Sequence, residues 1–106
     1  MNSFLIAVLV LSTFSIAKAE SMLEKCKVEV KSIAQMNMDQ KARSYGFDGA
    51  AVDSLDVVTL DREIETKIEK LYEFSTGAYI YKGSYTVKVV LDSSCAVSSV
   101  NITENL

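Results

Sequence analysis

The two cysteines, Cys26 and Cys95, are the side chains best suited to covalent chemistry in this 106-residue sequence, which contains no histidine. Their spacing is unlike the C-x-x-C pattern of thiol oxidoreductases, so no redox-catalytic pair is predicted. An even number of cysteines in a small exported domain is typical of a structural disulfide. We therefore predict a Cys26–Cys95 bridge that closes a loop of about 70 residues. Two buried free thiols are the alternative.

Groups that activate nucleophiles or hold cofactors are missing from the sequence. Without histidine, neither a Ser-His-Asp nor a Cys-His arrangement can form, and the usual zinc ligand is absent. The glycine-rich phosphate loops, the G-x-S-x-G elbow and the H-E-x-x-H motif are also absent. We predict a non-enzymatic protein with no catalytic residues, no metal and no cofactor.

Two groups of acidic side chains offer the remaining polar chemistry. One group comprises Glu63, Glu65, Glu69 and Glu73. Two of its carboxylates could serve a glycoside hydrolase, but on a strand they share a face with Lys67, which is typical of a solvated surface. The other group comprises Asp48, Asp53 and Asp56. It lacks the spacing of a calcium-binding loop, so we interpret both groups as surface residues.

Tyrosines form the most distinctive cluster, and they supply our candidate binding face. That face comprises Tyr72, Tyr79, Tyr81 and Tyr85. Tyrosine combines contact area with a polar tip, as in platforms that bind peptides, glycans or apolar ligands. The predicted face continues as Val87, Val89 and Leu91, and this continuity favours the other interpretation, in which the tyrosines form the wide end of the core.

The N-terminal residues resemble a secretory signal peptide. The apolar run from Phe4 to Leu11 is too short to span a bilayer, which takes about 20 residues. Ala17-Lys18-Ala19 is an A-x-A cleavage site, although no basic residue precedes the apolar run. We predict cleavage after residue 19 and a secreted or periplasmic protein. The alternative is a retained N-terminal anchor.

The predicted mature chain, residues 20–106, has the length of one small domain. The whole chain has 11 basic and 14 acidic side chains, and the leader contributes only the basic Lys18. A mildly acidic chain without a basic cluster lacks the electrostatic signature of a nucleic-acid or anionic-membrane binder. We therefore expect no nucleic-acid partner and no stable membrane insertion after cleavage. Another extracytoplasmic protein is the expected partner class.

Residues 21–45 are predicted to form one amphipathic helix. Ser21 and Glu24 match a capping box, and Gly46 can end the helix in the left-handed conformation. A single apolar stripe connects them: Leu23, Cys26, Val30, Ile33, Ala34, Met38, Ala42 and Tyr45. Alternation of apolar and charged residues from Cys26 to Lys31 leaves a short strand there as the alternative.

Four strands are predicted to follow, and the sheet is centred on residues 79–91. Apolar side chains alternate with polar ones throughout that stretch, which predicts one long strand. The other predicted strands cover residues 55–60, 64–75 and 95–103. Residues 64–75 also fit a helical stripe, which remains open. A turn at residues 47–49 connects the helix to the sheet.

These elements predict an α+β fold, in which the N-terminal amphipathic helix packs on a four-stranded antiparallel meander. On such a scaffold we expect a protein-binding or inhibitor-like module. The alternative is a small-ligand carrier, with a pocket between helix and sheet lined by Met36, Met38 and the tyrosines. Fold alone does not decide between them.

The leader prediction can be tested on the exported protein. Cleavage at the A-x-A site should give a mature chain that begins at Glu20, because signal peptidase cuts after the small residue. Intact-mass spectrometry and N-terminal sequencing of the secreted or periplasmic fraction measure this directly. A mass that includes residues 1–19 would instead support the retained anchor.

Overall fold

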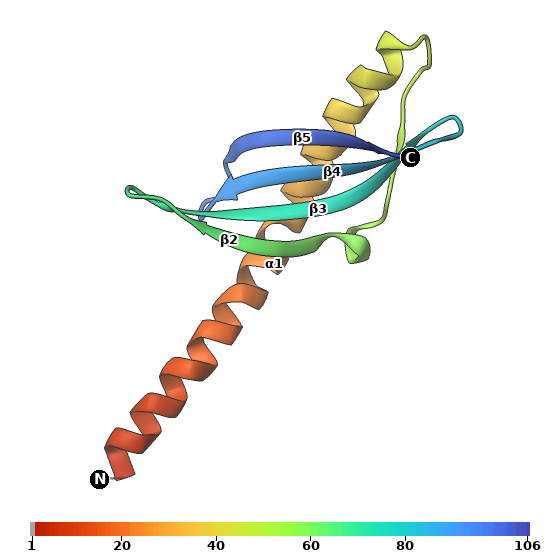
Figure 1. Ribbon diagram of the computed structural model, residues 1–106. Helices are drawn as coiled ribbons and strands as arrows, with labels where there is room; N and C mark the ends of the chain where they lie inside the picture. Colours follow the sequence, from red (N-terminus) through yellow and green to blue (C-terminus); the bar gives the residue numbers. More distant parts are fainter. Residues whose placement is uncertain (1) are drawn as a thin grey trace.

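In the computed structural model, residues 2–106 form a long helix and an antiparallel sheet (Figure 1), and side chains are described from Met22 onward. The elements are α1 (Asn2–Ser44), β1 (Ala51–Val52), the 3-10 helix η1 (Leu55–Val57), β2 (Thr59–Glu65), β3 (Lys70–Ile80), β4 (Gly83–Asp92) and β5 (Val97–Asn105). The predicted α+β fold is confirmed. The sheet has a fifth strand, the two-residue β1.

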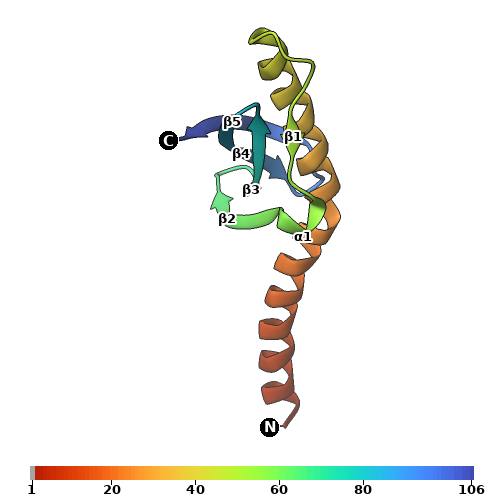
Figure 2. The same ribbon diagram turned by 90° about the vertical axis from the view of Figure 1, so that its right-hand side faces the viewer.

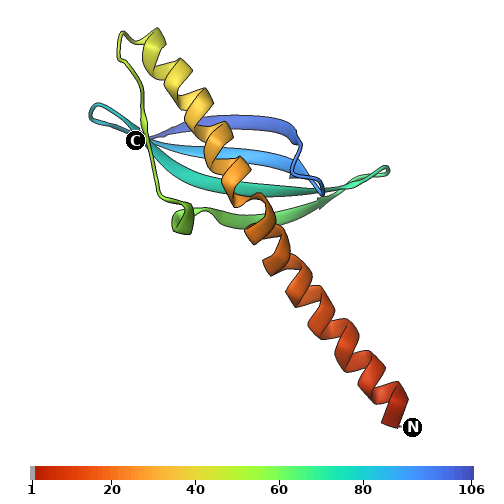
Figure 3. The ribbon, with the colours of Figure 1, turned by 180° about the vertical axis from the view of Figure 1, so that it is seen from behind.

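The sheet is arranged around β3, its longest strand. β3 pairs with β4 along one edge and with both β1 and β2 along the other, and β4 pairs with β5. All pairings are antiparallel. The helix covers one face of the sheet (Figure 2). It crosses the strands diagonally, with its N-terminal half projecting beyond them (Figure 3).

The helix packs on the sheet through side chains at every fourth residue. These are Met22, Cys26, Val30, Ala34, Met38 and Ala42, all at most 6% exposed. Because an α-helix turns about 100° per residue, a four-residue spacing moves each contact about 40° around the helix. The contact row is therefore inclined to the helix axis, which suits a diagonal crossing over a twisted sheet.

The described helix begins at Asn2, so the prediction that it starts at Ser21 is wrong for this chain. No glycine or proline interrupts residues 2–44, and helical hydrogen bonding therefore continues through the predicted cap. The same continuity rules out a strand at Cys26–Lys31. Within residues 2–106, we find no helix with the length and apolar character that crossing a membrane requires.

The helix ends at Ser44, and Gly46 supplies the left-handed residue of its cap, as predicted. Gly46 has a φ of 89°, its amide donates to the Arg43 carbonyl, and the Phe47 amide donates to the Ala42 carbonyl. This pair of bonds is the Schellman motif, which satisfies the last free carbonyl groups of a helix. The motif also fixes the position of Phe47 directly beyond the helix end. Tyr45, which we placed on the buried stripe, is instead exposed.

The predicted strand at residues 79–91 is wrong, because the chain reverses at Tyr81-Lys82 to form the β3–β4 hairpin. Ile80 pairs with Gly83 and Ala78 with Tyr85. The side chains facing the helix are therefore even-numbered in β3 and odd-numbered in β4. The turn shifts the alternation by one residue, but the exposed Tyr79 and Tyr81 hide this shift by continuing the odd-numbered apolar pattern of β4 in the sequence. The turn also contains no glycine, asparagine or aspartate to mark it.

The other strand boundaries also shift. Residues 64–75 divide between β2 and β3 around a turn in which the Thr66 hydroxyl accepts hydrogen bonds from the Ile68 and Glu69 amides. Both the single strand and the helix considered for this stretch are therefore wrong. Residues 55–57 form η1 rather than a strand, and the last strand begins at Val97.

The core lies between α1 and the central strands. β3 contributes Tyr72, Phe74, Ala78 and Ile80, and β4 contributes Tyr85, Val87, Val89 and Leu91. Ala34 and Ala42 allow the helix to approach the sheet closely. The opposite sheet face is polar: the Glu73 carboxylate accepts two hydrogen bonds from Arg62, at 3.2 and 3.3 Å, and lies 3.7 Å from the Lys88 ammonium. Because only one face of the sheet is buried, apolar and polar side chains alternate along β4.

The predicted disulfide is confirmed. Cys26 on α1 and Cys95 in the β4–β5 turn are bonded, with their Cα atoms 5.4 Å apart and a sequence separation of 69 residues. The Asp92 carboxylate organises that turn by accepting hydrogen bonds from the Ser94 hydroxyl and from the Ala96 and Ser94 amides. These bonds hold the pKa of Asp92 below its ordinary value. The bridge therefore attaches a well-ordered turn to the helix.

Replacing both cysteines with alanine should lower the free energy of unfolding by roughly 4 kcal/mol, because the long loop gains entropy in the unfolded chain. Urea denaturation of the Cys26→Ala/Cys95→Ala variant measures the loss. Reduced wild-type protein is the matched control and should unfold at a similar urea concentration. An unchanged midpoint in the variant would contradict a stabilising role for the bridge.

Candidate functional site

The structure separates the four tyrosines of the candidate binding face. Tyr72 and Tyr85 are buried in the core on the helix side of the sheet. Tyr79 lies on the opposite face of β3, and Tyr81 occupies the β3–β4 turn; both are exposed. The reversal at Tyr81 explains the separation. The core interpretation therefore fits Tyr72 and Tyr85, whereas a surface role is open to Tyr79 and Tyr81.

Exposed aromatic side chains gather where the helix end meets the β3–β4 turn. We call Tyr45, Phe47 and Tyr81 the aromatic tip; their exposed fractions are 56%, 42% and 77%. The Phe47 and Tyr81 rings stack, with centroids 5.7 Å apart and planes 20° from parallel. The tip therefore joins residues from two distant parts of the chain, one placed by the helix cap and the other by the hairpin.

Lysines accompany the rings of the tip. The Lys82 ammonium lies 5.4 Å from the centre of the Tyr81 ring. The Lys41 ammonium lies 5.4 Å from the centre of the Tyr45 ring and 5.8 Å from that of Tyr85. Cations at such distances are attracted to aromatic ring faces. The tip thus offers a combination of ring surface and positive charge to a partner.

Tyr81 holds a backbone conformation that bulky residues avoid. Its φ is 53°, in the left-handed region that glycine and asparagine favour. A side chain other than glycine costs about 1 to 2 kcal/mol in this conformation. The turn therefore keeps an exposed aromatic ring at a position where glycine would relieve the backbone strain. Strain of this kind is concentrated at functional sites.

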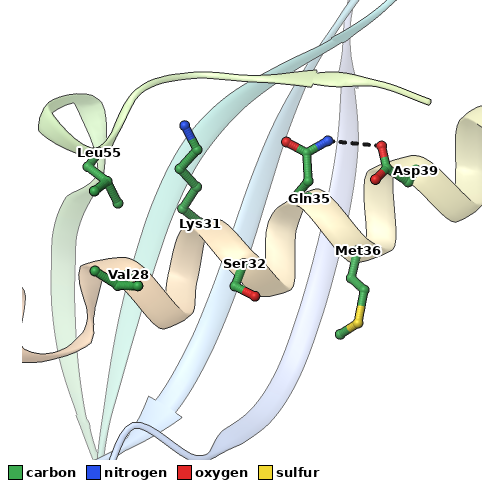
Figure 4. Close-up of a pocket in the computed structure, with 7 residues that line it drawn as sticks. All are labelled: Val28, Lys31, Ser32, Gln35, Met36, Asp39 and Leu55. Carbon is green, nitrogen blue, oxygen red and sulfur yellow. Dashed lines mark hydrogen bonds between the residues drawn. The ribbon is translucent and has the colours of Figure 1, made fainter.

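A second surface feature is an open groove between α1 and the segment after β1, with a volume of about 460 Å³ (Figure 4). It is lined by Val28, Lys31, Ser32, Gln35, Met36, Asp39 and Leu55. Met36 is exposed in this groove, whereas Met38 is buried against the sheet. The structure thus places the two methionines of the expected carrier pocket on different sides of the helix.

Polar contacts at one end of the groove attach the helix to the chain before β1. The Asp39 carboxylate accepts hydrogen bonds from the Ala50 amide and the Gln35 side chain, both at 2.9 Å, and Gln35 also donates to the Ala50 carbonyl. The bond from Ala50 and then that from Gln35 hold the pKa of Asp39 below its ordinary value. These groups are occupied in holding the fold together.

Most of the acidic side chains found in the sequence lie at the surface, but the surface prediction is wrong for Glu73, which is only 9% exposed. The Lys70 ammonium lies 3.4 Å from the Glu63 carboxylate and 3.6 Å from that of Glu65. Asp56 accepts a hydrogen bond from the Ser54 hydroxyl. Within the described part of the chain, no group of three or more histidine, cysteine or acidic side chains is placed to hold a metal ion.

Comparisons with protein-family models, with curated proteins and with solved structures give no match to this chain. The surface of the chain itself therefore has to indicate what the protein binds. Sequence reasoning singled out Tyr81 but missed Tyr45 and Phe47. Two aromatic residues flanking a helix-ending glycine were the available signal, because the cap places residues at this point outside the core.

Replacing Tyr81 with glycine should change the free energy of unfolding by less than about 1 kcal/mol, because relief of backbone strain offsets the lost ring stacking. Tyr72→Ala is the contrasting variant. It empties a core site and should cost about 3 to 5 kcal/mol. Urea denaturation of both variants measures the difference. A loss above about 2 kcal/mol in Tyr81→Gly would show that Tyr81 serves the fold.

Proposed function

We propose that this chain is an exported, non-enzymatic binding module that presents the aromatic tip to another extracytoplasmic protein. The observation that carries the proposal is Tyr81, an aromatic side chain that is 77% exposed and held in a left-handed turn. The leader and the disulfide support an oxidising compartment outside the cytoplasm.

The strain at Tyr81 supports a contact role better than a folding role. The ring is largely exposed, so it buries little apolar surface within the chain. Tyrosine is enriched at the centres of protein interfaces, where it fills pockets on the partner. A partner that buries this ring provides the stabilisation that the free protein lacks.

Stacking on Phe47 prepares the Tyr81 ring for binding. A side chain that is already ordered loses less conformational entropy when a complex forms. Phe47 is itself fixed by the Schellman motif at the end of α1. The hairpin extends beyond the rest of the sheet (Figure 1), so its turn can enter a concave surface on the partner. This geometry supports the inhibitor-like form of the proposal.

A small-ligand carrier remains the alternative, supported by the groove beside α1. Its lining includes the apolar side chains of Val28, Met36 and Leu55. Ligand pockets generally bury most of the ligand surface, whereas this groove lies open along the outer side of the helix. Core side chains meanwhile occupy the space between helix and sheet where the carrier pocket was expected. Both observations favour the protein-binding module.

Replacing the tip aromatics should abolish partner retention. The Phe47→Ala/Tyr81→Ala variant removes the stacked pair and should weaken binding at least tenfold, as is typical of interface hot spots. Affinity capture from the native periplasm or medium, quantified by mass spectrometry, compares it with wild type. Ile68→Ala is the matched control, because Ile68 is 95% exposed in the β2–β3 turn. Equal retention by all three proteins would contradict the proposal.

A further inference from the structure

The two edges of the sheet are protected against strand pairing to different degrees. On one edge, β2 carries four charged side chains among seven residues and has an irregularity between Leu60 and Arg62. On the other edge, β5 has nine residues and a single charge, Glu104. Charges and bulges are the usual devices that prevent an edge from pairing with another strand. The β5 edge has only the one charge, and its irregularity is confined to its start, where Val90 pairs with Ser99 and Leu91 with Val97.

β5 pairs with β4 on one side only, and no described element pairs with its other side. Its backbone groups on that side therefore have no strand partner within residues 2–106. The strand contains no proline and consists largely of β-branched and small polar residues. It forms the free margin of the sheet in Figure 1. Such an edge can accept an extended segment as an additional strand.

The two faces of β5 specify the side chains that an added strand must carry. Val100 and Ile102 face the helix, opposite Val89 and Val87, and are only partly buried. Ser99, Asn101 and Thr103 face the polar side and are exposed. Side chains of an added strand follow the same alternation. Apolar groups on the helix side would complete the burial of Val100 and Ile102.

The middle of the neighbouring helix flank carries no charge, between Lys25, which donates to the Ser93 carbonyl, and Lys41, which lies over the Tyr85 ring. Gln35 and Asp39 bond to Ala50 beside β1, and β1 lies across the sheet from β5. Because the helix turns about 100° per residue, Ile33, Asn37 and Gln40 occupy the opposite flank, toward β5. The last turns of α1 continue past β5 in two perpendicular views (Figures 1 and 2). The middle of an added strand would therefore lie beside uncharged helix side chains.

We propose that β5 binds an extended, uncharged segment of a partner protein, with apolar side chains toward α1 and serine, threonine or asparagine on the other face. A second copy of this chain fits the β5 edge less well than such a segment does. Antiparallel pairing of two β5 strands places both helices on the same face, where the end of α1 already extends past the edge. The inference deepens the proposed binding function and rests on it, but it concerns a surface separate from the aromatic tip.

The test uses a capped peptide of nine alternating valine and threonine residues, matched to the length of β5 and followed by a Gly-Lys-Lys tail for solubility. Hydrogen exchange by NMR on the oxidised protein should show peptide-dependent protection of alternate β5 amides, at least tenfold, with β2 amides unchanged. Val100→Lys should lose the protection, because it places a charge where apolar side chains meet. Tyr81→Gly should bind the peptide as wild type does, which separates this surface from the tip.

Two N-methylated peptides identify strand addition. One peptide carries methyl groups on its odd-numbered amides and the other on its even-numbered amides. A methyl group blocks pairing only where the amide faces β5, so one peptide should lose binding and the other should retain it. Absence of protection in β5, or equal binding by both methylated peptides, would overturn the proposal. Association of the protein with itself through β5 would also overturn it. Circular dichroism of Val100→Lys confirms that the variant is folded.

Discussion

The contact row on α1, one side chain at every fourth residue, is the constraint on which the rest of the molecule depends. It fixes the helix diagonally across β3 and β4, and its alanines bring the backbone close to the sheet. The same row places Cys26 beneath the β4–β5 turn, within bonding distance of Cys95. At the other end, the helix stops where Gly46 positions Phe47 against the hairpin. One regular spacing therefore governs the core, the covalent link and the most exposed aromatic cluster.

The parts of the fold that could be predicted are those encoded by side chains close together in sequence. The helix from Met22 to Ser44 follows from its apolar stripe, its end follows from Gly46, and the disulfide follows from two cysteines in a chain with a predicted leader. The β3–β4 hairpin could not be predicted in the same way. Tyr81-Lys82 lacks the usual turn residues, and the exposed Tyr79 and Tyr81 continue the odd-numbered apolar pattern of β4 although they do not face the helix.

The candidate site was less predictable because it depends on contacts between distant residues. Tyr81 was a candidate from its residue type, but its true neighbour, Phe47, lies beyond the helix end. Tyr72 and Tyr85 share that residue type and serve the core instead. Composition identifies residues capable of binding, whereas only the register of the strands shows which of them reach the surface. The outer sheet face is mainly polar, which makes the aromatic tip and the sparsely charged β5 edge stand out.

The position of the disulfide affects how the protein withstands chemical reduction. Cys26 is fully buried, and Cys95 is partly covered by the turn that Asp92 organises. Exchange requires a thiolate to approach one of the two sulfur atoms, and access at Cys26 is closed while the helix remains in place. A reductant therefore reaches the bridge through the partly exposed Cys95, and the order of the turn around that residue governs how long the bridge survives in a mildly reducing medium.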